Sequence, residues 1–149
     1  MNKIKINRLI LAGLATLLMF IAVEIFVEQL VGRSIFGGMY DQWYITTNVV
    51  HWKAANYILN IALALLNSTL LIWLYASLRP MFGVGYKTAL IASGISVVLG
   101  FSMTINGINL GLFPARLGMV EWVYEVIELP LAMIVGALVY EGASAPQLA

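Results

Sequence analysis

Residues 79–86 have the sequence R-P-M-F-G-V-G-Y and lie between two long apolar stretches, Ala55–Ser77 and Lys87–Asn109. Each stretch has roughly the 20 residues that a helix needs to cross the hydrocarbon core of a bilayer. Pro80 is expected to stop the first helix, and the two glycines that follow permit the chain to reverse. The connection is too short for anything except a tight turn. The middle of the chain therefore predicts a hairpin of two antiparallel membrane-spanning helices.

Two further apolar stretches, Leu9–Val31 and Leu117–Tyr140, flank this hairpin. Of the 149 residues, 62% are hydrophobic and 10% are charged, whereas a soluble globular domain has about 25% charged residues. A small water-soluble protein has a large surface relative to its core, and so few charged side chains cannot cover it. The predicted fold class is all-α: an antiparallel four-helix transmembrane bundle that forms a single membrane domain over residues 1–149.

Two segments are predicted to lie outside the helices. Residues 32–54, between the first two helices, are rich in aromatic side chains. Tryptophan and tyrosine favour the headgroup level of a bilayer, so this segment is expected to be an aromatic extracytoplasmic loop. Residues 142–149 are mostly small or polar and are expected to form a short disordered tail.

The basic residues predict the orientation. Five fall on the side of the bundle that carries both chain ends, namely Lys3, Lys5, Arg8, Arg79 and Lys87. Three fall on the other side, namely Arg33, Lys53 and Arg116. Because basic residues are enriched on the cytoplasmic side, both termini are predicted to lie in the cytoplasm.

Several classes of chemistry have no support in the sequence. The absence of cysteine removes disulfides, thiolate nucleophiles and cysteine-ligated metals. A net charge of +1 argues against nucleic acid, which needs a concentrated basic face. A di-iron site would need two Glu-x-x-His pairs, and the single histidine, His51, is expected to be an ordinary polar residue. No nucleophile–base pair or phosphate loop is present, so we predict no catalytic residue, metal or cofactor, and the balance is against an enzyme.

The polar residues of the predicted helices gather at one level. Glu24 and Glu28 are four residues apart and share a helix face, as do Glu125 and Glu128 of the last helix. Because successive helices run in opposite directions, both pairs lie in the extracytoplasmic half of the bundle. Two asparagines at the start of the second helix lie at the same level. The candidate site for a ligand or a proton therefore consists of Glu24, Glu28, Asn56, Asn60, Glu125 and Glu128.

This acidic cluster has two interpretations. A charged side chain deep in a bilayer costs about 2.5–3.5 kcal/mol on insertion scales, so such residues often mark a functional site. Alternatively, basic residues at the outer ends of the helices could pair with Glu28 and Glu121, and glutamate–asparagine hydrogen bonds could hold the helices together. The sequence leaves both interpretations open.

The segment Trp73–Ala89, W-L-Y-A-S-L-R-P-M-F-G-V-G-Y-K-T-A, resembles the central hairpin of a family of small, uncharacterised bacterial four-helix integral membrane proteins. That family has W-L-Y-A-x-x-R-P-x-F-G-x-G-x-K-T-A at this point. The segments Asn7–Gly13 and Val135–Glu141 are also similar, as are the glutamates at Glu24 and Glu128, whereas the aromatic loop is outside the resemblance. The resemblance implies a four-helix architecture and a bacterial cytoplasmic membrane, and it implies no particular activity.

Three functions agree with these features. In the first, the protein binds a cation, a proton or a small amphiphile in an outer-facing acidic pocket without catalysing a reaction. In the second, it is a structural or accessory subunit of a larger membrane complex. In the third, it is a dimeric proton-coupled transporter similar to the small multidrug exporters that have one membrane glutamate, although five outer carboxylates fit that pattern poorly. The expected partners are the lipid bilayer and either further copies of the chain or a larger membrane complex, with no nucleic acid.

Overall fold

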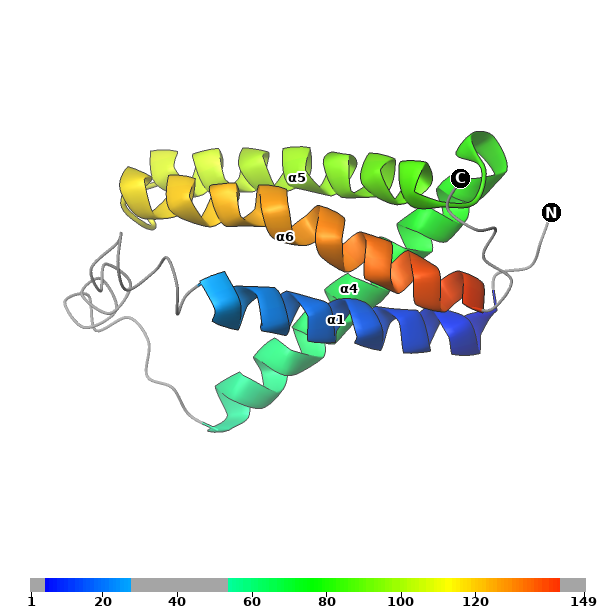
Figure 1. The fold of residues 1–149 in the computed structure, drawn as a ribbon. Helices are drawn as coiled ribbons and strands as arrows, with labels where there is room; N and C mark the ends of the chain where they lie inside the picture. Colours follow the sequence, from blue (N-terminus) through cyan, green and yellow to red (C-terminus); the bar gives the residue numbers. More distant parts are fainter. Residues whose placement is uncertain (1–4, 28–53, 143–149) are drawn as a thin grey trace.

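The computed structural model describes residues 5–27 and 54–142, which form four helices (Figure 1). Their bounds are α1 Ile6–Val27, α4 Ala54–Phe82, α5 Tyr86–Asn109 and α6 Ala115–Glu141. Each helix is long and apolar enough to cross a membrane. The prediction of an all-helical chain with four apolar helices of membrane-spanning length is therefore confirmed for this part of the chain.

Some predicted elements lie outside the described residues. These are the last residues of the first span (28–31), the aromatic loop up to residue 53, and the tail from residue 143 onward.

The turn between α4 and α5 differs from the prediction in one respect. Pro80 lies inside α4, which continues to Phe82, so the prediction that Pro80 stops the helix is wrong. A proline removes only one backbone hydrogen bond, and here the helix continues until the backbone enters the left-handed region at Gly83, with φ 86°. The Gly83 N–H still donates to the carbonyl of Arg79 at 2.9 Å. Gly85, with φ 129°, completes the reversal, which confirms the predicted role of the two glycines.

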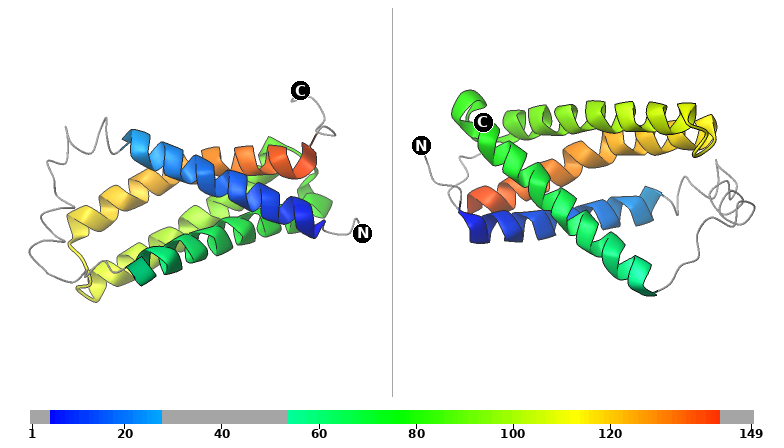
Figure 2. Two further views of the ribbon diagram at one scale, coloured as in Figure 1. Left: turned by 90° about the horizontal axis from the view of Figure 1, so that it is seen from below. Right: turned by 180° about the vertical axis from the view of Figure 1, so that it is seen from behind.

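The main cluster of buried hydrophobic residues lies in one half of the bundle. It is built from the beginning of α1, the end of α4, the beginning of α5 and the end of α6, which all lie at the end of the molecule that carries the α4–α5 turn (Figure 1). Its members are Leu9, Ala12, Ile72, Tyr75, Ala76, Ala89, Ala92, Met133, Ala137 and Tyr140. Toward the other end, α4 diverges from α5 and crosses the bundle diagonally (Figure 2). This cluster therefore lies in the half of the bundle that contains the beginning of α1 and the end of α6.

Glycines permit the closest helix contacts in this half. A Cβ on Gly136 of α6 would collide with Thr16 of α1 and with Ile72 of α4. A Cβ on Gly13 of α1 would likewise collide with Thr69 of α4. Small residues allow helix backbones to approach in a membrane, where packing rather than the hydrophobic effect drives association. The crossing of α1, α4 and α6 therefore depends on these two glycines.

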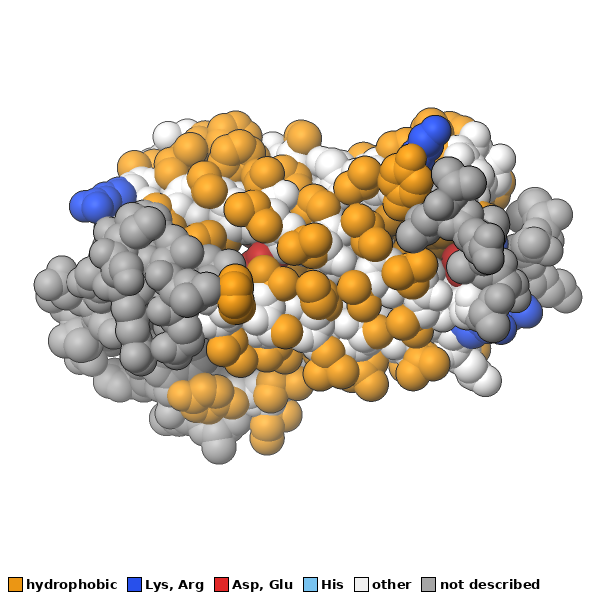
Figure 3. Space-filling view, in the orientation of Figure 1, with side chains coloured by type: hydrophobic (Ala, Val, Ile, Leu, Met, Phe, Trp, Pro, Cys, Tyr) orange, Lys and Arg blue, Asp and Glu red, His pale blue; other side chains and the backbone are white. Residues whose placement is uncertain are grey.

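The outer surface of the bundle is apolar. Every helix exposes large aliphatic side chains, such as Leu18 at 59%, Ile58 at 70%, Val98 at 64% and Ile127 at 53%. Hydrophobic side chains cover the middle of the face shown in Figure 3, and the basic side chains of the described residues on that face lie near its two ends. This distribution is the one expected of a protein whose sides contact lipid.

We expect Gly136→Ala to lower the free energy of unfolding by about 1–3 kcal/mol, because the added methyl group must displace Thr16 and Ile72. The matched control is Gly94→Ala in α5, where a Cβ would meet nothing within 4 Å. That substitution should leave the stability unchanged or raise it by up to about 1 kcal/mol. Thermal unfolding in detergent micelles, followed by circular dichroism, measures both. Equal effects of the two substitutions would contradict the close contact at Gly136.

Candidate functional site

Three of the predicted site residues, one on α1 and two on α6, lie near one another. Glu24 of α1 and Glu125 of α6 both lie close enough to Glu128 of α6 for their charges to act on its carboxylate. Glu125 and Glu128 are half-buried, whereas Glu24 is exposed. Glu125 and Glu128 are three residues apart on one helix, a spacing that places them on the same face. The structure therefore places three carboxylates in one region of the apolar span.

Glu125 occupies space that a glycine leaves free. Its carboxylate packs against Gly100 of α5, at the position where a side chain on that residue would lie. The Oε2 atom is buried and has no hydrogen-bond partner among the described residues. A buried oxygen without a donor is destabilising, so the carboxylate has an unused capacity to accept a hydrogen bond or a positive charge.

The backbone of α6 adds an acceptor at the same level. Pro130 lies inside the helix and has no N–H, so it cannot donate to the carbonyl of Val126 four residues earlier. That carbonyl belongs to the turn between Glu125 and Glu128. The acidic region of α6 thus includes a backbone oxygen without its helical donor.

Basic residues do not neutralise this cluster within the part of the chain that the structure describes. The ion pair found there joins Arg79 to Glu141 and involves none of Glu24, Glu125 and Glu128. Like charges repel strongly in a medium of low dielectric constant. The three carboxylates therefore form a region of negative charge that a positive ligand would stabilise.

The asparagines and Glu28 are not joined to this cluster by any described contact. Asn60 is exposed on α4 and forms no hydrogen bond with another described residue. Glu28 lies outside the described residues, and the side chain of Asn56 is likewise not described. The participation of these three residues in a site stays a prediction.

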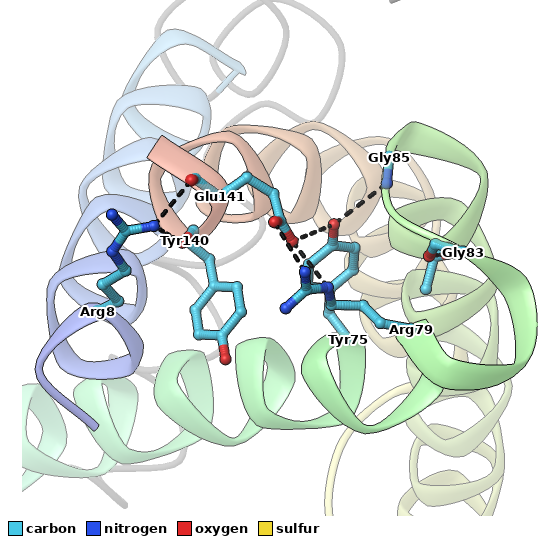
Figure 4. A network of polar contacts seen from close by, with 8 residues as sticks. Arg8, Tyr75, Arg79, Gly83, Gly85, Tyr140 and Glu141 are labelled. Carbon is cyan, nitrogen blue, oxygen red and sulfur yellow. Dashed lines mark hydrogen bonds and ion pairs between the residues drawn. The ribbon is translucent and has the colours of Figure 1, made fainter. Parts of the chain in front are cut away.

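A second polar cluster lies at the opposite end of the bundle (Figure 4). The carboxylate of Glu141, at the end of α6, accepts a hydrogen bond from the Tyr75 hydroxyl at 3.0 Å and one from Nη2 of Arg79 at 3.0 Å. Nε of Arg79 lies 2.9 Å from Oε1 of the same carboxylate. The Tyr75 hydroxyl in turn accepts the N–H of Gly85 at 3.2 Å. Glu141 therefore joins α6 to both sides of the α4–α5 turn.

Arg8 adds α1 to this cluster. Its Nη1 atom donates to the backbone carbonyls of Glu141 at 2.9 Å and Tyr140 at 3.4 Å. These carbonyls lack helical donors because they belong to the last turn of α6. The guanidinium of Arg79 lies 5.4 Å from the centre of the Tyr140 ring, and the rings of Tyr75 and Tyr140 meet edge to face at 6.2 Å. All four helices contribute to this end of the molecule.

This second polar cluster was not predicted from the sequence. Glu141 lies near the end of the chain in the sequence, and its partners are 62 and 66 residues earlier. Spacing along one helix cannot detect such a contact. One signal was available, because the resemblance covers both Trp73–Ala89 and Val135–Glu141, the two segments that meet here.

The described residues do not offer a metal site. Among residues 5–27 and 54–142, no group of three or more histidine, cysteine, aspartate or glutamate side chains is arranged to hold a metal ion.

Comparisons of the chain with protein-family models, with curated proteins and with solved structures found no match.

We expect Glu141→Gln to lower the free energy of unfolding by about 1.5–3 kcal/mol, the contribution of hydrogen bonds to a charged group. The substitution keeps the shape of the side chain but leaves the Arg79 guanidinium without its counter-charge. Thermal unfolding in detergent micelles measures the effect. Combining it with Arg79→Gln should give a loss smaller than the sum of the two single losses. Strict additivity would contradict the pairing seen in Figure 4.

Proposed function

We propose that the protein binds a proton or a small organic cation between α1 and α6, with Glu24, Glu125 and Glu128 supplying the negative charge. The observation that carries this proposal is the proximity of three carboxylates in an apolar span without a basic partner among the described residues. An uncompensated charge at this depth costs free energy. A bound cation would remove that cost, which is the physical basis of the binding.

The surroundings of the carboxylates favour an amphiphilic cation over a strongly hydrated one. The residues next to these glutamates in the sequence, such as Val126, Ile127 and Ile25, expose apolar side chains on the surface of α6 and α1. Apolar groups of a ligand gain free energy by leaving water for such surroundings, while its positive charge is held by the glutamates. A proton would compete for the same carboxylates, so binding and proton release are coupled.

The proposed orientation completes this description. The bundle is antiparallel, both termini lie in the cytoplasm, and the membrane is the bacterial inner membrane. Support comes from Arg8 and Arg79, which meet at the end that carries the α4–α5 turn, because positively charged residues favour the cytoplasmic side. In this orientation the three carboxylates lie toward the extracytoplasmic side.

A role as a structural or accessory subunit is the second candidate. It is favoured by Asn60 and Asn67, which are exposed on α4, because polar side chains on the surface of a membrane helix often contact a neighbouring helix. A dimeric proton-coupled transporter would combine both features, and it stays a prediction.

Tetraphenylphosphonium, an apolar organic cation, tests the proposed site. The full chain in lipid nanodiscs should bind it in isothermal titration calorimetry and release protons in a weakly buffered solution. Glu128→Gln should weaken binding at least about tenfold, because the charge closest to the other two carboxylates is lost. Glu121→Gln, about two turns closer to the start of α6, is the control and should retain binding. Unchanged affinity of Glu128→Gln would overturn the proposal.

Glu128→Gln, which should weaken binding, should increase the stability of the protein. Glu128→Gln removes the repulsion among the three carboxylates, so we expect it to raise the free energy of unfolding by up to about 3 kcal/mol, the insertion penalty of a buried charge. Glu24→Gln should raise the free energy of unfolding by less when Glu128→Gln is already present, since each substitution relieves the same repulsion. Thermal unfolding of the two single variants and the double variant measures this coupling. Destabilisation by Glu128→Gln would indicate a paired, structural glutamate instead.

A further inference from the structure

One face of α4 carries exposed asparagines in its first half and packed leucines in its second half. Asn60, Ala64, Asn67, Leu71, Leu74 and Leu78 follow one another at alternating spacings of four and three residues. This spacing forms a continuous seam of the kind through which two helices pack. Within the seam, Leu71, Leu74 and Leu78 pack against the buried core of the bundle. The first half of the same seam is different, because Asn60 and Asn67 are exposed.

The divergence of α4 explains this change. The helix lies beside α5 near the turn and separates from it toward its own first residue (Figures 1 and 2). The first half of the seam is therefore not covered by α5. The side chains of the two asparagines form no hydrogen bond with another described residue, although they lie within the candidate membrane span Tyr57–Phe82.

Exposed asparagine in a membrane span has a specific physical consequence. Lipid chains offer neither donors nor acceptors, so an amide there is left without hydrogen bonds unless another polar group reaches it. Two such amides, seven residues apart on one seam, can be satisfied together by one neighbouring helix. The feature therefore indicates a helix–helix interface rather than a surface that faces lipid.

We propose that this seam binds the α4 helix of a second copy of the chain, with Asn60 and Asn67 forming hydrogen bonds across a two-fold axis. The occupant follows from the chemistry of asparagine, whose amide is both a donor and an acceptor and is therefore complementary to itself. Two copies with the same orientation in the membrane place equal residues opposite each other, and a two-fold interface requires such self-complementarity. Between the two asparagines, the small side chain of Ala64 permits the close approach of the helices.

The carboxylates of the proposed cation site are not part of this seam. Dimerisation through α4 and cation binding between α1 and α6 are therefore separable, and either can fail without the other.

Disulfide cross-linking tests the interface directly, because the chain contains no cysteine and a single introduced one gives an unambiguous product. Ala64→Cys places a thiol in the seam and keeps both asparagines. Ala62→Cys is the matched control, since this exposed alanine is two positions away and lies on the opposite side of the helix. In native membranes oxidised with copper phenanthroline, Ala64→Cys should give a product of twice the monomer mass, and Ala62→Cys should give little of it. The proposal would be overturned if both variants cross-linked equally, if only monomer were seen, or if the product were an adduct with a different protein.

A second measurement tests the role of the amides. In lipid vesicles, the dimer fraction of fluorescently labelled protein should fall when Asn60→Leu and Asn67→Leu are combined, with the association constant weakened about tenfold or more. Asn106→Leu is the control, because it replaces an exposed asparagine of α5 that lies outside the seam. Dimerisation that is unaffected by the α4 substitutions, or weakened equally by Asn106→Leu, would contradict the assignment of the interface.

Discussion

Glu141 carries a negative charge at the C-terminal end of α6, where the helix dipole is itself negative, and only 10% of its side chain is exposed. Neither condition is favourable for a carboxylate. Two arginines from other helices offset both of them, because Arg79 pairs with the carboxylate and Arg8 binds the terminal carbonyls of the helix. Removing one partner would leave a buried charge uncompensated. The charge balance at the end of α6 therefore requires α1, α4 and α6 to meet there.

Other contacts of the bundle are connected to this meeting point of α1, α4 and α6. The α4–α5 turn is fixed to it through the Tyr75 hydroxyl and the N–H of Gly85, and the glycine contacts of Gly136 allow α1, α4 and α6 to pack closely just beyond it. Toward the other end of the bundle α4 diverges (Figure 2), and the ion pair between Arg79 and Glu141 involves none of the carboxylates of Glu24, Glu125 and Glu128. The polar contacts around Glu141 therefore stabilise the end of the bundle that carries the α4–α5 turn.

The sequence predicts the parts of this structure that depend on local chemistry. Span length and hydropathy identify four helices, and the positive backbone angles at the α4–α5 turn occur at the glycines that the turn sequence contains. Helical spacing and the alternation of direction place Glu24 at the level of Glu128, and the structure brings these two residues together. The network around Glu141 could not be predicted in this way, because Arg8 lies 133 residues away along the chain. The divergence of α4 was also inaccessible, since it depends on packing angles that no periodicity in the sequence specifies.

Helix α6 contains glutamates of two kinds, and their difference is the strongest physical argument for a function. The carboxylate of Glu141 accepts hydrogen bonds from the Tyr75 hydroxyl and the Arg79 guanidinium, so its charge is compensated within the chain. Glu128 lies in the same helix but has two other carboxylates as its charged neighbours. A structural role for Glu128 would call for a cationic or donor partner of the kind that Glu141 has, and the described residues supply none. A positive group near Glu128 would offset the repulsion from its two acidic neighbours, which is the physical basis of the proposed binding.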